Sequence, residues 1–372
     1  MITVGIISEY NPFHKGHMRQ IEAIRRSFDT DVTVISLMSG NFVQRGEFAI
    51  LPKGYRAKAA ILSGADLVLE YPYPWSGACA EIFAAGGVAI LSALGVNYLC
   101  FGSESGELSS LTLQAERLSS NAFESTFSEA IKKNPATAYA VIRDSVYEKL
   151  YGESLARRAN DILGVQYLLA LKKQNSKMKP LVIKREGFES ATASRAAYRD
   201  ENYDELKNLA TQYSLEIMAE QKAVRMQKLE EGILLFLRLA RADAFDGIME
   251  LTDDLRRRML SAAQKVKTLD EFFEAVASKS YTNARVRRVL LSMLFSVDRA
   301  TVHSMPAFTR LLGAREKGRA FLEGATFPIL KRAGDGATYG EAVAKQVAFA
   351  DRADCIYQSA DENLPLHKPF IL

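Results

Sequence analysis

The sequence predicts an α/β protein with a doubly wound parallel sheet, followed by a mainly α-helical domain. Short apolar runs suited to buried strands alternate with helical periodicity through the first half of the chain. From about residue 203 the strand signal ends, and apolar residues recur at three- to four-residue spacing. A chain of 372 residues is long enough for two cores. We therefore expect one domain at residues 1–202 and a second at residues 203–372.

Five strands are expected in the first domain, at residues 3–7, 32–37, 66–69, 98–101 and 181–184. Helical periodicity separates them, for example at residues 56–62 and 84–94. Strands that alternate with helices pair in parallel, and the ligand then lies beyond their carboxyl ends. The loops that follow the strands should therefore carry the function.

The turn after the first strand, at residues 10–17, places two imidazoles and a glycine at the start of a helix. Free amides and the helix dipole near Gly16 favour an anion, and glycine lets a phosphate approach the backbone closely. His14 and His17 are three residues apart, so both rings can donate hydrogen bonds to one phosphoryl group. We take both as catalytic candidates. The alternative is that they only cap the helix or pair with nearby carboxylates.

The loops after the next three strands also carry suitable side chains. In the loop at residues 39–47, Gln44 and Arg45 can bind a carboxylate or phosphate, unless Arg45 pairs with Glu47. The stiff aromatic loop at residues 71–75 can stack on a nucleobase or pack against the neighbouring domain. Gly102 lets a ribose or adenine lie against the backbone, or it belongs to an ordinary turn.

A hydroxyl-rich turn follows the fifth strand and opens a helix. Thr192, Ser194 and Arg195 offer hydroxyls and a cation to the β- and γ-phosphates, although helix capping alone explains Ser190 or Thr192. Asn160 precedes another apolar helical stretch. It either caps that helix or faces the nucleotide, and composition does not separate the two roles.

Composition describes an ordinary soluble protein with 48% hydrophobic and 25% charged residues. The net charge of +4 is spread evenly, because residues 1–200 hold 23 Lys/Arg and 20 Asp/Glu, against 25 and 24 in residues 201–372. Any nucleic acid must therefore be bound through local basic patches. No terminal stretch has the pattern of a secretory signal, and residues 82–96 are too short and interrupted for a membrane span, which predicts a buried helix in a cytoplasmic protein.

Cysteines are too few and too scattered for a disulfide framework or a zinc site. We expect Cys79, Cys100 and Cys355 to be buried thiols, and we expect no protein-bound metal.

Several segments together resemble a known family. The pattern His-x-Gly-His after a first strand is similar to the signature of the nucleotidyltransferase superfamily, whose members act at the α-phosphate of ATP on a Rossmann-like sheet. The chain more specifically resembles the bacterial tRNA(Met) cytidine acetate ligases. The likeness runs through residues 9–17, 38–47, 101–104, 160–164, 190–192, 281–288 and 326–329.

The resemblance implies an enzyme that activates acetate with ATP to acetyl-adenylate. It then passes the acetyl group to N4 of the wobble cytidine (position 34) of elongator tRNA(Met), giving N4-acetylcytidine without acetyl-coenzyme A. Mg²⁺ is expected with the ATP phosphates. The ATP site implied is Ile7, Ser8, Glu9, Tyr10, Asn11, Pro12, Phe13, His14, Lys15, Gly16, His17, Met18, Arg19 and Gln20, with Gly102, Asn160 and Arg185.

The sequence departs from the family pattern in two places. Gly54 and Tyr55 stand where the family usually has a tryptophan after the lysine that matches Lys53. The family's longer loop after Arg185 is shortened here to residues 186–189.

Basic clusters in the helical half are candidates for phosphate contacts with tRNA. They contain Arg256 and Arg257, with Arg258 beside them, and Arg285, Arg287 and Arg288. The alternative is that these arginines are solvated or salt-bridged on helix faces. A wobble base is single-stranded and can be splayed into a pocket, and Tyr71, Tyr73 and Trp75 lie on a plausible loop to stack on it.

Two other functions remain open from the sequence. An adenylyltransferase that makes a nucleotide cofactor would use the same first half, but it does not need so large a helical half. A non-catalytic RNA-binding protein with a relict nucleotide site would need only the basic clusters. The sequence gives no prediction of the oligomeric state.

Overall fold

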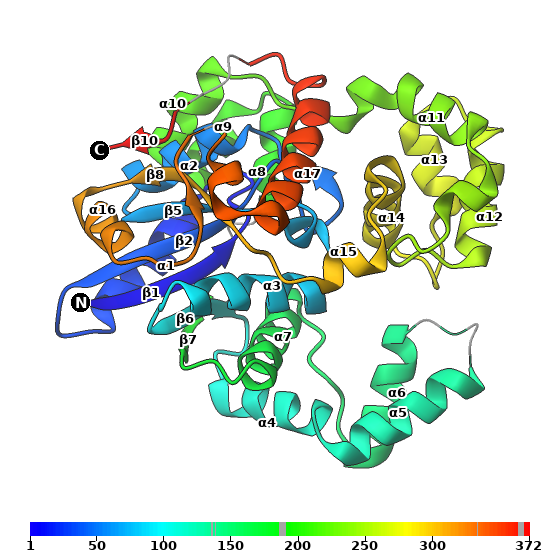
Figure 1. The fold of residues 1–372 in the computed structure, drawn as a ribbon, viewed down its shortest axis with the longest axis horizontal. Coiled ribbons are helices and arrows are strands. Elements are labelled where there is room, and N and C mark those ends of the chain that lie inside the picture. The colour runs from blue at the N-terminus through cyan, green and yellow to red at the C-terminus, as the bar shows by residue number, and fades with distance from the viewer. Residues whose placement is uncertain (135–136, 138, 186–190, 333, 364–367) are drawn as a thin grey trace.

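The computed structural model describes residues 1–134, 137, 139–185, 191–332, 334–363 and 368–372. A central sheet has helices on both faces, and two groups of helices extend away from it (Figure 1). The predicted α/β class with a helical part is confirmed.

All five predicted strands are present and parallel, each slightly longer than expected. The order across the sheet is β5-β2-β1-β6-β7. From β1 the chain connects to β2, which lies on one side of β1 in the sheet. From β5 it crosses to β6, which lies on the other side of β1. This reversal creates a crevice at the carboxyl ends of β1 and β6. The strands are β1 Ile2–Ser8, β2 Val32–Ser39, β5 Leu67–Tyr71, β6 Tyr98–Ser103 and β7 Lys179–Lys184.

Helices α1 (Lys15–Arg26) and α2 (Lys53–Leu62) pack on one face of the sheet, and α3 (Ala80–Ala93) and α7 (Ala159–Lys173) pack on the other. Side chains of β1 alternate between these two layers. Gly87 lets α3 approach β1 closely, since an added Cβ there would lie 2.5 Å from Ile7 Cδ1. The stretch at residues 82–96 is the buried helix that we predicted.

The last third of the chain returns to the sheet, so the expectation that strands end near residue 203 is wrong. Strand β8 (Thr309–Ala314) pairs antiparallel with β5, and β10 (Phe370–Ile371) and β9 (Ile329–Leu330) pair with β8. These strands are short or lack alternation, which is why periodicity missed them. The sheet thus uses residues from both sides of the predicted boundary at residue 202, and that boundary stays a prediction.

Most of the remaining helices form three groups. One packs against α2, another is the lobe drawn below the sheet in Figure 1, and the third lies to one side of the sheet and shares its apolar core with α3 and α7. In that order the groups are α8 Ala191–Arg199, α9 Tyr203–Leu209 and α10 Gln212–Glu220; α4 Leu108–Leu118, α5 Asn121–Lys133 and α6 Tyr139–Tyr151; and α11 Glu230–Leu239, α12 Asp253–Ala263, α13 Leu269–Val276, α14 Asn283–Phe295 and α15 Arg299–His303.

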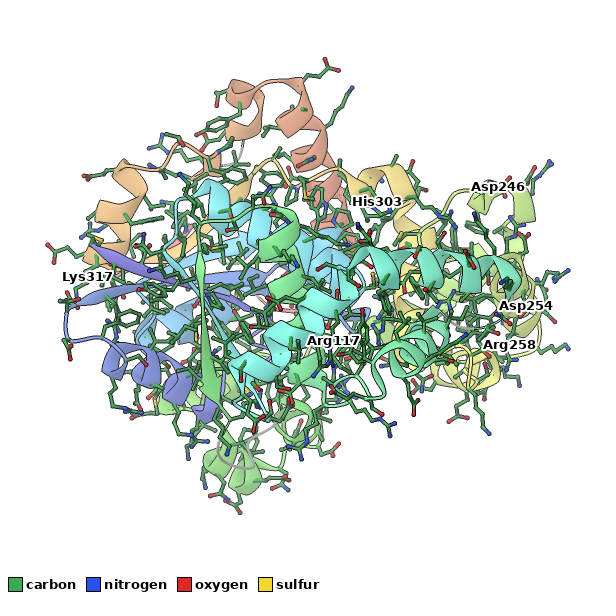
Figure 2. The ribbon with its side chains drawn as sticks, turned by 90° about the horizontal axis from the view of Figure 1, so that it is seen from below. Arg117, Asp246, Asp254, Arg258, His303 and Lys317 are labelled. Carbon is green, nitrogen blue, oxygen red and sulfur yellow. The ribbon has the colours of Figure 1, made fainter. Side chains whose placement is uncertain are left out.

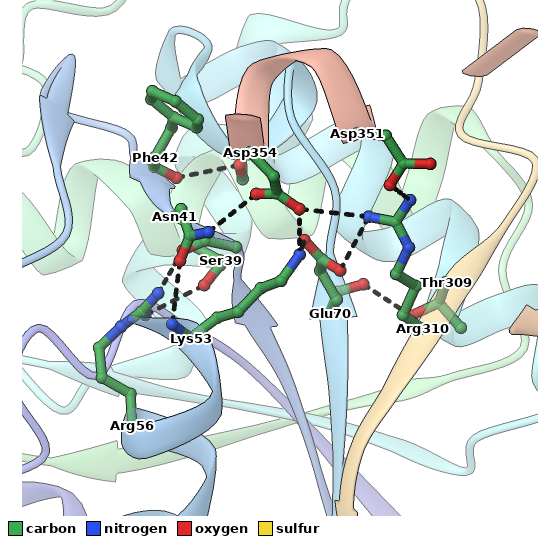
Figure 3. A network of polar contacts seen from close by, with 12 residues as sticks. Ser39, Asn41, Phe42, Lys53, Arg56, Glu70, Thr309, Arg310, Asp351 and Asp354 are labelled. Carbon is green, nitrogen blue, oxygen red and sulfur yellow. Dashed lines mark hydrogen bonds and ion pairs between the residues drawn. The ribbon is translucent and has the colours of Figure 1, made fainter. Parts of the chain in front are cut away.

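A buried polar network ties the C-terminal helix α17 (Glu341–Gln358) to the sheet (Figure 3). Lys53 Nζ contacts Glu70 Oε1 at 2.7 Å and Asp354 Oδ2 at 2.5 Å, and Arg310 bridges the same two carboxylates. Burial raises the pKa of Asp354, whereas for Glu70 the cations Lys53 and Arg310 outweigh burial and lower the pKa. Buried charges of this kind are tolerated only when they are paired.

Beside this network, the buried Arg56 donates to the carbonyls of Glu9, Ser39, Gly40 and Leu51 (Figure 3). It thereby fixes the ends of β1 and β2 next to each other. The chain beyond β2 forms a small hairpin, β3 (Phe42–Val43) with β4 (Glu47–Phe48).

Two other sequence expectations concern membranes and cysteines. Among the described residues no helix is both long and apolar enough to cross a membrane. Cys100 is buried and Cys79 is partly buried, but Cys355 is exposed on α17, so the expectation for Cys355 is wrong.

Candidate active site

A cavity of about 530 Å³ lies at the carboxyl ends of β1 and β6, where the strand order reverses. It is bounded by the starts of α1, α7 and α8 and by the β3–β4 hairpin. Most of the residues predicted for the nucleotide site are brought together here, from six separate segments. They are Ile7, Ser8, Glu9, Tyr10, Asn11, His14, Gly16, His17, Arg19, Gln20, Gln44, Arg45, Gly102, Asn160, Arg185, Thr192 and Arg195.

Five other predicted site residues are not part of the cavity wall: Pro12, Phe13, Lys15, Met18 and Ser194. Phe13 is buried in the core and Met18 packs against the same core. The amino group of Lys15 donates to the carbonyl of Lys207 at 2.7 Å. Ser194 is fully buried. The residues 186–189 and Ser190 lie outside the described part of the chain.

His14 and His17 form a stacked pair at the start of α1. Their ring centroids are 3.7 Å apart, with an interplanar angle of 24°. His14 Nδ1 accepts from the amide of Gly16 at 3.1 Å, and His17 Nδ1 accepts from the amide of His14 at 3.2 Å. The two rings therefore cap the helix reciprocally, as a capping box does. The two histidines therefore cap the helix, as one alternative predicted, and both rings also line the cavity.

These hydrogen bonds assign the tautomers. A ring whose Nδ1 accepts must carry its proton on Nε2 when it is neutral, so Nε2 is the N–H donor of each neutral ring. Burial, the neighbouring His14 and Arg185 lower the pKa of His17 well below its usual 6.5. His17 is thus a neutral hydrogen-bond donor at physiological pH.

Two arginines supply positive charge to the wall of the cavity. Arg195 is buried and donates to the carbonyl of Asn11 at 2.9 Å and to Thr192 Oγ1 at 3.3 Å. Arg185 Nη1 donates to Asn160 Oδ1 at 3.3 Å. An added Cβ on Gly102 would lie 3.2 Å from Arg185 Cγ, so a glycine keeps this wall open.

Asn160 is not the cap of α7, because Arg158 holds that position and Asn160 belongs to the first turn. Its side-chain amide donates to Glu104 Oε1 at 2.6 Å, and Glu104 Oε2 accepts from the amide of Asp161 at 3.1 Å. Sequence reasoning missed Glu104 and Asp161. A carboxylate directly after a strand and another at the start of a helix are the signal that could have found them.

The hairpin loop contacts the end of β1. The amide of Gln44 donates to Glu9 Oε1 at 2.9 Å, and Gln44 and Arg45 both line the cavity. The alternative pairing of Arg45 with Glu47 is not formed, since Glu47 instead makes an ion pair with Arg287 of α14.

Comparisons with known proteins agree with this geometry. The family model described as HIGH Nucleotidyl Transferase matches residues 1–368. The tRNA(Met) cytidine acetate ligase of Listeria monocytogenes is 34% identical over 341 residues, which cover 87% of this chain and 86% of that protein. The ligase of Caldanaerobacter subterraneus subsp. tengcongensis is 33% identical over 348 residues, with the same coverage of 87% and 86%. The chain belongs to the tRNA(Met) cytidine acetate ligase family.

Solved structures in the same family share the whole fold. A crystal structure of Thermotoga maritima TmcAL bound with alpha-thio ATP superposes with a TM-score of 0.92, at 29% identity and with complete coverage of both chains. The apo form of that protein gives a TM-score of 0.91 at 28% identity, also with complete coverage. The match therefore extends over the helical part as well as the sheet.

The aromatic loop, for which base stacking and packing were both open from the sequence, is part of the core. Tyr71, Tyr73 and Trp75 are all buried. Tyr71 donates from its hydroxyl to the carbonyl of Phe83 at 2.7 Å, and Trp75 Nε1 donates to the carbonyl of Ser304 at 2.8 Å. The packing alternative is correct for this loop, and these rings are not available to a base.

Most arginines of the expected tRNA-binding clusters make ion pairs within the protein. Arg256 pairs with Asp246 and Asp253, and Arg288 makes two hydrogen bonds to Glu250. Arg285 donates to the carbonyl of Glu250. Arg257 differs, since its side chain is 78% exposed and lies 3.9 Å from the carboxylate of Asp254. Figure 2 shows Asp246, Asp254 and Arg258 at the end of the molecule opposite Lys317.

Proposed function

We propose that this protein activates acetate with ATP and transfers the acetyl group to N4 of the wobble cytidine (position 34) of elongator tRNA(Met). The observation that carries the proposal is the stacked pair of His14 and His17, which caps α1 and faces a cavity at the switch point of the sheet. Membership of the ligase family supplies the acceptor. On this proposal the enzyme works in the cytoplasm, where its tRNA is found.

The nucleotide would lie across the carboxyl ends of β1 and β6. Gly102, Asn160 and Arg185 would contact the adenosine end, and the first turn of α1 would receive the α-phosphate. Thr192 and Arg195 line the wall where the β- and γ-phosphates would lie, and Ser194 is proposed beside them.

The first reaction needs no protein nucleophile. An acetate oxygen attacks the α-phosphorus, pyrophosphate leaves, and negative charge grows on the equatorial oxygens of the phosphate. The Nε2–H groups of His14 and His17 would donate to those oxygens, and backbone amides already fix the orientation of both rings through Nδ1. The enzyme then contributes mainly positioning and electrostatic stabilisation.

A magnesium ion would arrive with the nucleotide and be held by its phosphates. Among the described residues no group of three or more His, Cys, Asp or Glu side chains could hold a metal ion. The cavity wall near the proposed phosphates carries imidazoles and guanidinium groups, so the protein offers no cage of its own and no step is assigned to the ion.

The tRNA would reach the cavity across the helical part, which we propose as a second domain at residues 203–372. Arg257 offers an exposed cation for a phosphate. Arg256, Arg285, Arg287 and Arg288 stay proposed contacts, and each would have to exchange a partner within the protein for a phosphate.

The test is incorporation of radiolabelled acetate into purified elongator tRNA(Met), with ATP and without acetyl-coenzyme A. We expect label in N4-acetylcytidine at position 34. An adenylyltransferase for nucleotide cofactors would leave the tRNA unlabelled while still releasing pyrophosphate with its own acceptor. A relict site would bind tRNA and show no acetate-dependent exchange of pyrophosphate into ATP. Either result would refute the proposal.

A further inference from the structure

The carboxylate of Glu9 is not engaged by any ion pair among the described residues, although it lies in the cavity wall. Glu9 directly follows β1. By strand alternation its side chain lies on the same side of the sheet as Ile7, with α3 and α7, whereas Tyr10 faces the layer of α1 and α2. The amide of Gln44 holds Oε1 at 2.9 Å. One carboxylate oxygen is thus fixed by the hairpin, and the other is left for a bound group.

Tyr167 lies beside Glu9 in the same wall. Its hydroxyl is buried and has no hydrogen-bond partner within the described part of the chain. Burial, together with the negative charge of Glu9, raises the pKa of this phenol, so it stays a protonated donor. A buried hydroxyl without a partner in a cavity wall is usually satisfied by a ligand or water.

Apolar side chains line the same cavity as these two polar groups. They include Phe83, Phe101 and Leu163, and the ring centroids of Phe101 and Tyr167 are 5.6 Å apart. The end of the cavity at Glu9 and Tyr167 thus offers one acceptor and one donor beside an aromatic ring, which suits the edge of a nucleobase.

We propose that this end of the cavity binds the cytosine that is acetylated, with the Glu9 carboxylate accepting a hydrogen bond from the exocyclic amine and the Tyr167 hydroxyl donating to the adjacent ring nitrogen. This inference rests on the proposed function and names the acceptor site within it. Glu9 is also the base of the transfer step.

The donor and acceptor pattern distinguishes cytosine from uracil. Cytosine presents an N4 amine next to an N3 acceptor, which matches a carboxylate next to a hydroxyl donor. Uracil presents an oxygen and an N–H in the reverse order, so both contacts would be mismatched. Discrimination between these bases therefore follows from two side chains.

The step balances without a further reactant. The N4 amine attacks the carbonyl carbon of acetyl-adenylate and forms the C–N bond. The bond from that carbon to the phosphate oxygen breaks, and AMP leaves with the electron pair. The proton lost from nitrogen passes to Glu9. Burial raises the pKa of Glu9 despite the Gln44 hydrogen bond and the nearby Arg195, which makes its carboxylate a stronger base than an exposed one.

The first experiment separates the two reactions in Glu9→Gln, which keeps an oxygen to accept from the amide of Gln44. Because the family resemblance also places Glu9 in the ATP site, we expect acetate-dependent exchange of pyrophosphate into ATP to fall to some extent, but far less than transfer does. Single-turnover transfer from preformed acetyl-adenylate to tRNA should fall by roughly 10²- to 10⁴-fold. Glu9→Asp should restore part of the transfer rate. The exposed Glu323→Gln serves as the matched control and should leave both reactions unchanged.

The pH dependence of transfer is a second measurement on the same proteins. The wild-type rate should rise with pH as Glu9 loses its proton, with a midpoint above the ordinary glutamate value of 4.5 because burial raises this pKa. Glu9→Asp should keep this rising limb, and Glu9→Gln should lack it. Transfer by Glu9→Gln at the wild-type rate would overturn the inference. So would loss of exchange together with transfer in a folded protein, because Glu9 would then belong to the activation step.

Binding provides a readout that does not depend on turnover. An anticodon stem-loop RNA with cytidine at the wobble position should bind the wild-type protein, with ATP and without acetate, roughly 10- to 100-fold more tightly than the uridine version. Tyr167→Phe and Glu9→Gln should each narrow that ratio. Equal binding of the two RNAs by wild type would overturn the inference. Absence of acetate-dependent exchange in wild type would instead refute the proposed function, and the binding ratio would still decide on the cytosine site.

Discussion

Single residues at the start of α1 combine a structural role with a proposed chemical one. His14 and His17 satisfy backbone amides through Nδ1, and both rings also line the cavity. A ring fixed by the backbone loses little freedom when it binds a developing charge. The same contacts that begin the helix therefore preorganise the site.

At His14 we predict that replacement by alanine lowers acetate-dependent pyrophosphate exchange by roughly 10²- to 10³-fold, because one donor to the α-phosphate is lost. The cap would also be lost, at about 1 kcal/mol of stability. His14→Asn is the matched control, since asparagine can still cap the amide of Gly16 but does not reach the phosphate. Both variants should bind tRNA as wild type does. Exchange retained in His14→Ala would remove this residue from the mechanism.

At His17 the prediction concerns pH. Burial lowers its pKa well below 6.5 in the folded protein, whereas the unfolded chain takes up a proton near pH 6.5. As pH falls below that value the unfolded state binds more protons, so the free energy of unfolding falls by up to about 1.4 kcal/mol per pH unit from this group. Chemical denaturation at pH values from 8 to 5 should show a smaller fall in the free energy of unfolding for His17→Asn than for wild type. Parallel curves would contradict the buried neutral state.

At the scale of elements, the β3–β4 hairpin joins the cavity to the helical part. Its turn residue Gly46 has a φ of +73°, and an added Cβ would lie 2.4 Å from the backbone nitrogen of Arg288. The adjacent Glu47 pairs with Arg287 of the same helix, α14. Gln44 and Arg45, which line the cavity, are therefore positioned by a contact with the helical part.

We predict that Gly46→Ala destabilises the protein by about 2–4 kcal/mol, since it combines backbone strain with a clash against backbone atoms. Gly95→Ala is the control, because Gly95 has a nearly equal φ of +74° but nothing within 4 Å of an added Cβ. Gly95→Ala should lower the free energy of unfolding by the backbone strain alone, about 1 kcal/mol. Urea denaturation measures the stability of both variants. Equal losses would show that the hairpin does not pack against α14 as closely as described.

At the scale of the whole molecule, strands and helices from the last third of the chain complete the sheet and pack over its edge. The network of Lys53, Glu70, Arg310 and Asp354 joins α2, β5, β8 and α17. Its charges are buried, so each cation is needed to offset the desolvation of two carboxylates.

Replacement of Lys53 by methionine should lower the free energy of unfolding by about 3–5 kcal/mol, because two buried carboxylates would keep only Arg310 as a cationic partner. This loss of stability relative to wild type should become smaller as pH falls from 8 to 5. Burial raises the pKa of Asp354, and protonation of its carboxylate removes one uncompensated charge. Lys345→Met is the control. Its ion pair with Glu341 is exposed on both sides, so its loss should change stability by less than about 1 kcal/mol. A pH-independent deficit for Lys53→Met would contradict the charge argument.

Sequence patterns predicted the parallel strands and the histidine pair because these depend on local signals. An apolar run bounded by turns marks a buried strand, and the spacing of His14 and His17 on one helix brings their rings together wherever that helix lies. The pattern failed for β8, because a short strand such as 309–314 pairs with a partner more than 200 residues away and leaves no periodic trace. The sequence pattern likewise left two interpretations open for Asn160 and two for the basic clusters.

The sequence by itself determined the five parallel strands of the first half, the location of the histidine pair at the first turn, and the family. Only the tertiary structure decided that the aromatic loop is core, that Arg287 pairs with Glu47, and that Glu9 and Tyr167 share one end of the cavity. The physical reason is that hydrogen-bonded turns and amphipathic helices follow from neighbours in the chain, whereas burial and ion pairing depend on which distant segments pack together.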